Sequence, residues 1–340
     1  MQTTSKRRIA VLSPVAWRTP PERYGAWETV ASNVAEGLVA RGWDVTLFAT
    51  GDSLTAGRLE SVIPRGYEED REVDPKVAEY LHISNCFEQA DDFDLIHSHY
   101  DFMPLGYAQL VRPPVVTTIH GFSSPKILPV YRRYPDANYV SISDSDRDPE
   151  LRYRATVYNG IDTALYPFLE YAGEDLAFLG RIHPDKGLHL ALQVARMAGS
   201  RLWIGGIIQD QSYFEEQIEP YIDGEKVIYL GALDVDGKNA LFARARALLH
   251  LNTIPERFGL VLAEANCAGV PVIAMDCGSC REVIEGHKTG FLVNDALEAV
   301  SALDALSTID RRDCRARVEQ RFSIDAMTRG YEAVYSALLA

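Results

Sequence analysis

The residues best suited to chemistry lie between Ile254 and Ala265, where two carboxylates, Glu256 and Glu264, flank a Phe-Gly pair. The apolar run 260–268 predicts a helix that is buried on most sides, and Gly259 directly precedes it. Free N–H groups in a first helical turn carry roughly half a positive charge and attract anions. A glutamate fixed inside the helix can accept hydrogen bonds from a vicinal diol such as a ribose. The stretch indicates an anion site beside a sugar site, although two exposed glutamates in surface ion pairs would give the same pattern.

Two cations follow the strand predicted at 176–179. Arg181 offers a planar fork for paired phosphate oxygens, and Lys186 adds a point charge. Together they could neutralise the charge that grows on a diphosphate leaving group. We therefore predict a reaction that needs no metal ion.

Histidines stand at the ends of two further predicted strands. His97 and His99 alternate on the strand 94–99, so both rings share one face and could bind a metal, line a cleft or be structural. No third ligand is tied to them by spacing, and we expect no metal. The strand 115–119 delivers His120 to its carboxyl end, where ligands bind in open α/β sheets. A satisfied core histidine is the alternative for His120.

Alternating strands and helices must position these residues, which predicts an α/β fold with doubly wound parallel sheets. A helical stripe from Trp27 to Leu38 ends at Gly42. Residues 52–92 are expected to be irregular apart from a helical piece around 77–87, and a helix is expected to begin at Lys238. No G-x-G-x-x-G or Walker lysine motif follows the first strand. The other expected strands are 8–13, 44–49, 139–143, 202–206, 227–230, 247–251, 271–275 and 290–293.

The motifs resemble, in order along the chain, those of the retaining nucleotide-sugar glycosyltransferases of family 4, which have the GT-B fold. The resemblance implies two Rossmann-like doubly wound domains that face a central cleft, with a C-terminal helix crossing back to the first domain. It places an acceptor-side domain at 1–167 and a nucleotide-sugar domain at 168–322, with the helix 323–340 on the first domain. The residues that carry it are Glu256, Phe258-Gly259, Glu264, the run 267–274, Arg181, Lys186-Gly187, His120-Gly121-Phe122 and Asn159-Gly160.

The resemblance also implies roles for individual residues. Arg181 and Lys186 hold the donor diphosphate, and Glu264 holds the ribose. Glu256 contacts sugar hydroxyls, and His120 contacts the far side of the sugar. The remaining donor-side residues are Gly25, which lets the loop backbone approach the phosphate, Leu233 near the base, and Phe258, Gly259, Leu260 and Val261 at the helix N-terminus. Ala26 stands where family members usually have a second glycine.

The implied activity is transfer of a hexosyl group from a nucleotide diphosphate sugar to an acceptor hydroxyl with retention of configuration, in polysaccharide or glycoconjugate biosynthesis. We expect UDP-glucose rather than GDP-mannose, from the entry loop 20–25, and no cofactor. No side chain is an obvious nucleophile, which favours a same-face displacement. The acceptor, a sugar, a lipid-linked or a small molecule, would meet Trp17, Tyr24, Trp27, His99 and Tyr100.

Two other functions fit the same motifs. A nucleotide-sugar epimerase or hydrolase would use an additional acid near the anomeric carbon. A catalytically idle nucleotide-sugar sensor or partner subunit would fit the departures from the family pattern at Ala26 and Asn266. Release of sugar in the absence of acceptor would favour the epimerase or hydrolase. Tight donor binding without turnover would favour the sensor or partner subunit.

Composition narrows the class of protein further. A net charge of −14 and a pI near 5.1 argue against nucleic acid and against strong membrane association. Apolar runs are too short for a membrane span or a signal peptide, and we expect a cytoplasmic protein. Five cysteines are too few for a disulfide framework. Cys277 and Cys280 have CxxC spacing, but without a second such pair we expect no metal or redox role.

Overall fold

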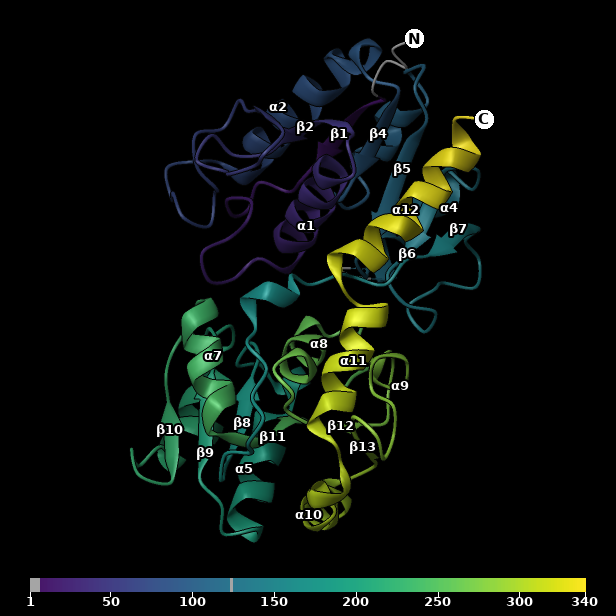
Figure 1. The fold of residues 1–340 in the computed structure, drawn as a ribbon. Coiled ribbons are helices and arrows are strands. Elements are labelled where there is room, and N and C mark those ends of the chain that lie inside the picture. Colours follow the sequence, from purple (N-terminus) through teal and green to yellow (C-terminus); the bar gives the residue numbers. More distant parts are fainter. Residues whose placement is uncertain (1–6, 123–124) are drawn as a thin grey trace. The chain divides into compact units, whose positions relative to one another are not determined.

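The computed structural model describes residues 7–122 and 125–340, and the chain divides into two compact units (Figure 1). One unit comprises Met1–Gly160 with Ile324–Ala340, and the other comprises Ile161–Ser323. The boundary expected at Pro167 lies within the second of these units. Each unit is built on a parallel sheet, which confirms the predicted α/β fold class.

In the described part of the first unit, seven parallel strands have the order β3-β2-β1-β4-β5-β6-β7. The chain starts in the middle of this sheet and winds outward in both directions, so the switch point lies between β1 and β4. The sequence did not predict the two edge strands, β3 and β7. The strands are β1 Arg8–Leu12, β2 Asp44–Phe48, β3 Arg58–Glu60, β4 Leu95–Ser98, β5 Val115–Ile119, β6 Asn138–Ser141 and β7 Tyr153–Thr156.

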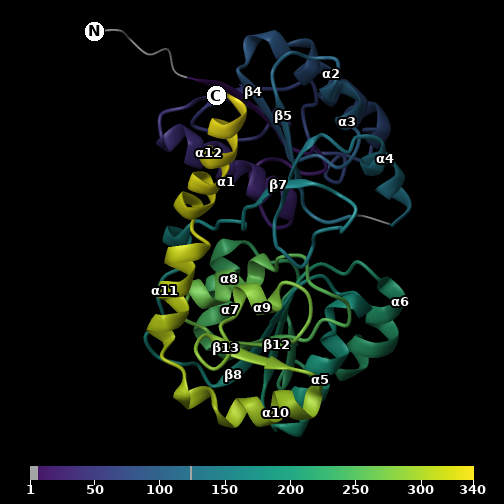
Figure 2. The same cartoon turned by 90° about the vertical axis from the view of Figure 1, so that its right-hand side faces the viewer.

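Helices cover both faces of this first sheet (Figure 2). On one face α1 (Ala26–Ala40) packs against β1, β2 and α12 (Ile324–Leu338). On the other lie α2 (Pro75–Glu88), α3 (Leu105–Ala108) and α4 (Leu128–Arg133). The apolar stripe of α12 buries Met327, Tyr331, Val334 and Tyr335.

The segment 52–92 is more regular than predicted. It contains β3, and α2 begins at Pro75, two residues before the helical piece expected at 77–87. Asp74 caps this helix by accepting a hydrogen bond from the Val77 N–H, and a proline at the first position has the backbone angle that a helix needs. Both are local signals that mark the start of a helix.

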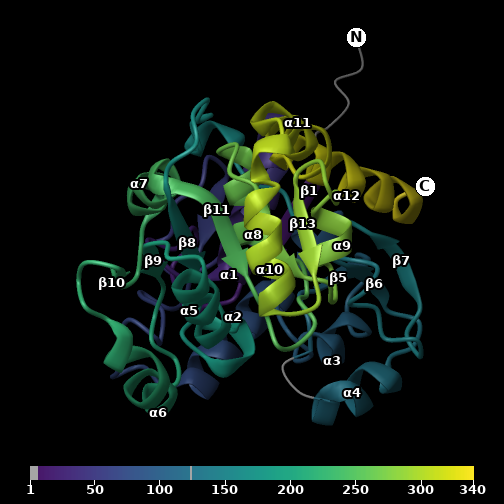
Figure 3. The ribbon, with the colours of Figure 1, turned by 90° about the horizontal axis from the view of Figure 1, so that it is seen from below.

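In the described part of the second unit, six parallel strands have the order β10-β9-β8-β11-β12-β13 (Figure 3). Here the switch point lies between β8 and β11, and ligands of such sheets bind at the carboxyl ends of the strands near this point. The strands are β8 Asp175–Leu179, β9 Leu202–Gly205, β10 Val227–Tyr229, β11 Ala245–His250, β12 Val272–Met275 and β13 Gly290–Val293.

Helices also cover this second sheet. On one face α5 (Leu188–Met197) and α10 (Ala296–Asp304) pack together; α7 (Val235–Arg244), α8 (Leu260–Cys267) and α11 (Arg311–Arg321) belong to the other. The short helices are α6 (Gln211–Tyr213) and α9 (Cys280–Val283). The expected start of α7 at Lys238 is wrong, because Asp234 caps the helix through the Gly237 N–H and Lys238 lies one turn inside. None of the described helices is both long and apolar enough to cross a bilayer.

Short helical turns connect these elements. They are 90–92, 125–127, 163–165, 184–186, 214–218, 219–221 and 306–308. The turn 184–186 matters most for the site, because it carries Lys186 from the end of β8 toward α5.

Candidate active site

Glycines at the carboxyl edge of the second sheet bring the loop after β8 against its neighbours. Gly187 has φ 66°, and a Cβ there would lie 1.8 Å from the Leu251 carbonyl oxygen after β11. Gly206 has φ 148°, and a Cβ there would lie 1.8 Å from the Gly180 carbonyl oxygen. Only glycine fits either position. The loop that carries Arg181 and Lys186 is therefore held at the strand ends near the switch point.

Glu256 lies at this edge as a buried, fully engaged carboxylate. Its Oε2 accepts hydrogen bonds from Lys186 Nζ (2.6 Å), His250 Nε2 (2.9 Å) and Asn252 Nδ2 (2.7 Å). Its Oε1 accepts from the Arg257 N–H at 3.0 Å. Burial alone would raise the pKa of Glu256, but the hydrogen bond from His250 and the charge of Lys186 outweigh burial and hold that pKa well below its usual range. Glu256 is therefore ionised at neutral pH and is not a proton donor.

The two cations retain capacity for a ligand. The Lys186 ammonium has three N–H groups and spends one on Glu256. The Arg181 guanidinium donates to Gln209 Oε1 and is partly exposed. Because Glu256 anchors Lys186 and an amide anchors Arg181, both positive groups are fixed in advance of any ligand.

The N-terminus of α8 is open, as the sequence predicted. Gly259 precedes the helix with φ 79°, and no side chain caps it. The N–H groups of Leu260 and Val261 have no hydrogen-bond partner in the part of the chain that the structure describes. The ring of Phe258 is buried edge-to-face on Phe322, with 5.7 Å between centroids, so only its backbone can meet a donor.

Glu264 projects from α8 and is held on one side only. Its Oε1 accepts from the Tyr166 hydroxyl and from Lys238 Nζ, both at 2.8 Å. Its Oε2 has no hydrogen-bond partner among the described residues and can accept from a ligand. Leu233, before α7, lies against Gly205 at the end of β9, where a Cβ would come within 2.6 Å of its Cδ1. The segment expected near the base therefore belongs to the same sheet edge.

In the first unit the predicted histidines form a buried chain on β4 and β5. His97 contacts Thr118 Oγ1 through Nε2 (2.8 Å) and the Tyr335 hydroxyl through Nδ1 (2.7 Å). His99 Nδ1 lies 3.0 Å from His120 Nε2. Burial lowers the pKa of His97 and of His120 to about 3, and burial lowers the pKa of His99 as well. All three rings are therefore neutral near pH 7.

The ring nitrogens of these histidines that lack a hydrogen-bond partner indicate the tautomer of His120. His99 Nε2 is buried and has no partner among the described residues. A buried orphan N–H costs more than a buried orphan lone pair, so the favoured proton position on His99 is Nδ1. His99 then donates to His120 Nε2, and His120 carries its own proton on Nδ1. That nitrogen makes no hydrogen bond within the described residues, which leaves it free to donate.

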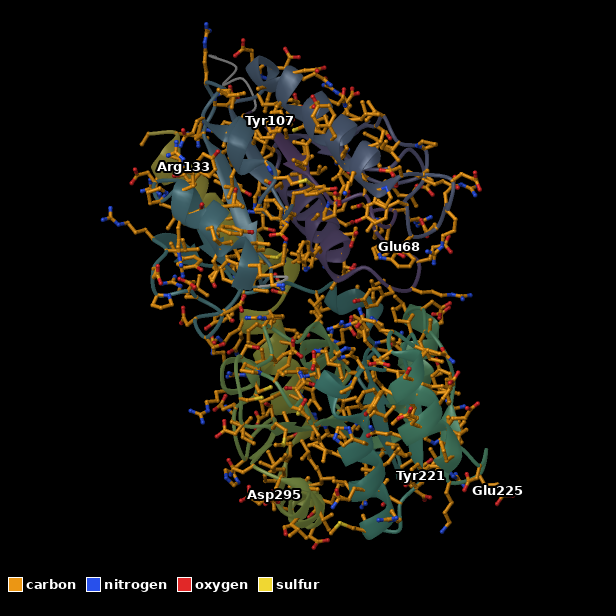
Figure 4. The ribbon with its side chains drawn as sticks, turned by 180° about the vertical axis from the view of Figure 1, so that it is seen from behind. Glu68, Tyr107, Arg133, Tyr221, Glu225 and Asp295 are labelled. Atoms are coloured by element: carbon orange, nitrogen blue, oxygen red, sulfur yellow. The ribbon has the colours of Figure 1, made fainter. Side chains whose placement is uncertain are left out.

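A cavity of about 1020 Å³ lies in the first unit. Of the residues predicted for the acceptor, Trp17, Tyr24, Trp27 and Tyr100 line it, but His99 does not. Trp27 stacks on His120, with 5.5 Å between ring centroids, so His120 lies behind one wall. Tyr107, another lining residue, is labelled in Figure 4. Among described residues, the aromatic lining is Trp17, Tyr24, Trp27, Tyr67, Tyr80, Tyr100, Phe102, Tyr107 and Tyr134.

Sequence reasoning missed the residues that hold the carboxylates. His250 ends β11, and a polar residue at the carboxyl end of an apolar strand was a usable signal for it. Asn252 lies two residues further on. Tyr166 and Lys238 reach Glu264 from elements distant in sequence, so no local pattern marks their role.

The CxxC segment lies directly behind Glu256. The Ser279 N–H donates to the Glu256 carbonyl oxygen at 3.0 Å. Cys277 is partly exposed and Cys280 is buried, and both are free thiols. A hydrogen bond from Cys280 lowers the pKa of Cys277 to about 7. Within residues 7–122 and 125–340, no group of three or more His, Cys, Asp or Glu side chains is arranged to hold a metal ion.

Two units in one chain, each built on a doubly wound parallel sheet, are the architecture of the GT-B class of α/β proteins. The model of glycosyltransferase family 4 matches residues 27–165, and the model of glycosyl transferases group 1 matches residues 172–320. The chain therefore belongs to the family 4 glycosyltransferases, as its motifs indicated.

Known proteins with related sequences or folds agree with this family. A Klebsiella pneumoniae 41.2 kDa protein in the cps region is 33% identical over 48% of this chain and 46% of its own. A phosphatidyl-myo-inositol mannosyltransferase of Mycobacterium leprae is 25% identical over 90% of this chain and 88% of its own. The structure of Anabaena Alr3699/HepE in complex with UDP-glucose superposes with a TM-score of 0.73 at 18% identity, covering 97% of this chain and 99% of that one.

Proposed function

We propose that this glycosyltransferase transfers a glucosyl group from UDP-glucose to an acceptor hydroxyl with retention of configuration and without a metal ion. The observation that carries the proposal is the anchored pair of cations, Arg181 and Lys186, at the same sheet edge as the open N-terminus of α8. These groups match a diphosphate in charge and in hydrogen bonding.

The proposed reaction is a displacement on one face of the sugar. The acceptor oxygen forms a bond to the anomeric carbon as the bond from that carbon to the diphosphate oxygen breaks. The departing phosphate oxygen takes the acceptor proton, so no enzyme base is needed. Arg181, Lys186 and the N–H groups of Leu260 and Val261 stabilise the charge on the leaving diphosphate.

The remaining site residues bind and orient the donor in this proposal. Glu264 Oε2 accepts from the ribose hydroxyls, while Tyr166 and Lys238 fix the carboxylate through its other oxygen. Glu256 holds Lys186 in place, which is a positioning role beside the sugar contact that the family pattern implies. His120 donates from Nδ1 to a sugar hydroxyl. UDP-glucose is favoured as the donor because a relative of the same fold binds it.

The double variant Arg181→Ala, Lys186→Ala tests the proposal. Losing two charged contacts to the leaving group should reduce kcat/KM for UDP-glucose by at least about a thousandfold. The matched control is Arg201→Ala, Lys226→Ala, which removes the same two residue types from the amino ends of β9 and β10. Transfer at the wild-type rate by the first variant would contradict the proposal.

Two further measurements separate the other functions. Thermal shifts with UDP-, GDP- and ADP-sugars identify the donor, because a ligand at 100 times its Kd stabilises the fold by about 2.7 kcal/mol. Free glucose formed without acceptor would indicate a hydrolase, and binding without turnover an idle sensor. Asn266 gives the sensor no support, because its amide donates to the Val270 and Thr289 carbonyl oxygens, both at 3.0 Å, and is structural.

A further inference from the structure

The aromatic cavity of the first unit has acidic groups on three separate elements. Glu28 comes from the first turn of α1, Glu79 from α2, and Asp101 from the segment after β4. The one lining side chain of opposite charge is Lys76, which is exposed. Among the described residues that line it, the cavity therefore has three carboxyl groups against one ammonium group.

Two of these carboxyl groups lack a compensating cation. Within the described residues Glu28 and Glu79 form no ion pair, and Glu28 is 3% exposed. Burial raises the pKa of Glu28 to about 7, and the charge of Glu69 adds to the shift. Burial also raises the pKa of Glu79, with a smaller contribution from Asp101. Bringing a positive charge near either group would favour its ionised form.

The walls of the cavity supply a second, independent indication of a ligand. A volume of about 1020 Å³ with nine aromatic side chains is at the upper end of what small-molecule sites enclose. Tyr100 is 5% exposed, and its buried hydroxyl, although near the Glu79 carboxyl, has no hydrogen-bond partner of ordinary geometry among the described residues. Aromatic faces attract ammonium groups as well as apolar surface.

We infer that the acceptor is a cationic amphiphile: a hydroxyl-bearing molecule with an apolar or aromatic body and a protonated amine that lies near Glu28 and Glu79. The inference rests on the proposed function, since it takes this cavity as the acceptor site. Phosphate- or carboxylate-bearing acceptors are disfavoured, because their charge would meet two carboxyl groups that form no ion pair inside aromatic walls. Of the acceptor classes that the motifs leave open, a small basic molecule is thus favoured over an anionic lipid.

Three aryl glucosides that differ in the charge of one small para substituent test this inference. The probes are 4-(aminomethyl)phenyl, 4-(hydroxymethyl)phenyl and 4-carboxyphenyl glucoside, which are cationic, neutral and anionic at pH 7.5. Trp17 and Trp27 line the cavity, so intrinsic fluorescence of the full chain reports binding without donor or turnover. The cationic probe should bind at least about tenfold more tightly than the anionic one, with the neutral probe between them.

Variants that neutralise one acidic residue test whether the cavity causes the preference for the cationic probe. Glu79→Gln keeps an oxygen for the Tyr67 hydroxyl, which donates to Glu79 at 3.2 Å, and should reduce the ratio of Kd values to about threefold or less. Glu28→Gln gives a second, independent reading if the first variant folds poorly. The matched control is Glu88→Gln, an exposed acid at the end of the same helix, which should leave the ratio unchanged.

The outcomes distinguish this inference from the proposed function. Equal binding of the three probes, tighter binding of the anionic probe, or a ratio that neither variant changes would overturn the inference. Failure of the proposed function would instead appear as loss of UDP-glucose binding or of transfer, which the probe titration does not measure. A transfer assay with the same three glucosides should follow the order of the Kd values.

Discussion

Lys186 Nζ and Glu256 Oε2 form an ion pair of 2.6 Å in which both side chains are largely buried. The pair joins the loop after β8 to the segment after β11, across the switch point of the second sheet. His250 and Asn252 add hydrogen bonds to the same oxygen, so the negative charge is compensated by several donors. A charge pair of this kind positions the ammonium group for a ligand, and removing one partner leaves the other buried without compensation.

Glu256→Gln should destabilise the second unit. The variant removes the negative charge beside Lys186, at a cost of about 2 to 4 kcal/mol at pH 7. Because folding lowers the pKa of Glu256, its contribution is fully present above about pH 4.5 and is lost as the pH falls through the folded value. Urea unfolding at several pH values should show the difference from wild type shrinking below pH 4.5. Glu170→Gln, in an exposed pair with Arg312, should change stability by less than about 1 kcal/mol.

Glu264→Ala should weaken binding of the nucleoside part of the donor. With the ribose acceptor removed, the Kd values of both uridine and UDP should rise about tenfold. The Arg181→Ala, Lys186→Ala variant should weaken UDP binding but leave uridine binding unchanged, because uridine lacks the diphosphate. Tyr166→Phe keeps the Lys238 contact to Glu264 and should change either Kd by less than about threefold. Calorimetric titration with the two ligands decides the matter; equal losses for both ligands in every variant would contradict these assignments.

The predictability of a strand from sequence depends on its residue types and its burial. The strands predicted at 115–119 and 290–293 agree with β5 and β13 at both ends, although β13 lies at an edge of its sheet, because both segments are largely buried and consist mainly of β-branched or apolar residues. The edge strand β3 reads Arg-Leu-Glu over three residues, and such a segment has no apolar run to reveal it. The short edge strand β7, Tyr153–Thr156, is also only partly buried.

The sequence predicts candidate site residues one by one but not the contacts between them. Spacing and motif identified Lys186 and Glu256 separately. Their pairing requires Gly187 to approach Leu251, which is a tertiary contact between two loops 60 or more residues apart in the chain. The same reason explains why Tyr166 and Lys238 were not predicted as partners of Glu264.

Substitutions of His99 should reveal whether its Nδ1 contact with His120 supports transfer. Asn places its amide where His has Nδ1, so His99→Asn keeps a donor for His120 and should retain kcat within about threefold. Gln places its amide where His has Nε2, so His99→Gln should lower kcat by about tenfold or more with little change in KM. The measurement is steady-state kinetics with UDP-glucose at saturating acceptor. Equal kcat values for the two variants would contradict a role of this contact in transfer.

Mild acid should destabilise the first unit more than the second. Four histidines of the first unit, His82, His97, His99 and His120, are buried, and burial lowers the pKa of each, in the case of His82 to about 4. Unfolded histidines bind protons below about pH 6.5, whereas in the folded protein His82, His97 and His120 stay neutral down to about pH 4, and the pKa of His99 is also lowered by burial. Unfolding therefore takes up protons in this window, and the free energy of unfolding should fall with decreasing pH by up to about 1.4 kcal/mol per unit for each histidine.

The tryptophans allow this acid effect to be assigned to one unit. Trp17, Trp27 and Trp43 lie in the first unit and Trp203 in the second, so Trp203→Phe restricts the fluorescence signal to the first unit. Urea unfolding of that variant at pH 7.5, 6.0 and 5.0 gives the slope. His82→Gln keeps a donor for the Ser13 carbonyl oxygen, which lies 2.8 Å from His82 Nε2, and should flatten the slope. A slope that stays the same would exclude His82 as a contributor.

Cys277 should be the thiol that alkylating reagents modify first in the native protein. The thiolate is the nucleophile, so the rate rises with pH through the pKa, and for Cys277 the midpoint should lie near pH 7 rather than about 8.5. Cys86, Cys267, Cys280 and Cys314 are buried and should react slowly. Because the hydrogen bond from Cys280 is the main cause of the lowered pKa, Cys280→Ala should move the midpoint of Cys277 upward. Iodoacetamide labelling from pH 6 to 9, followed by peptide mass analysis, measures both midpoints; an unchanged midpoint in the variant would show that Cys280 does not stabilise the thiolate.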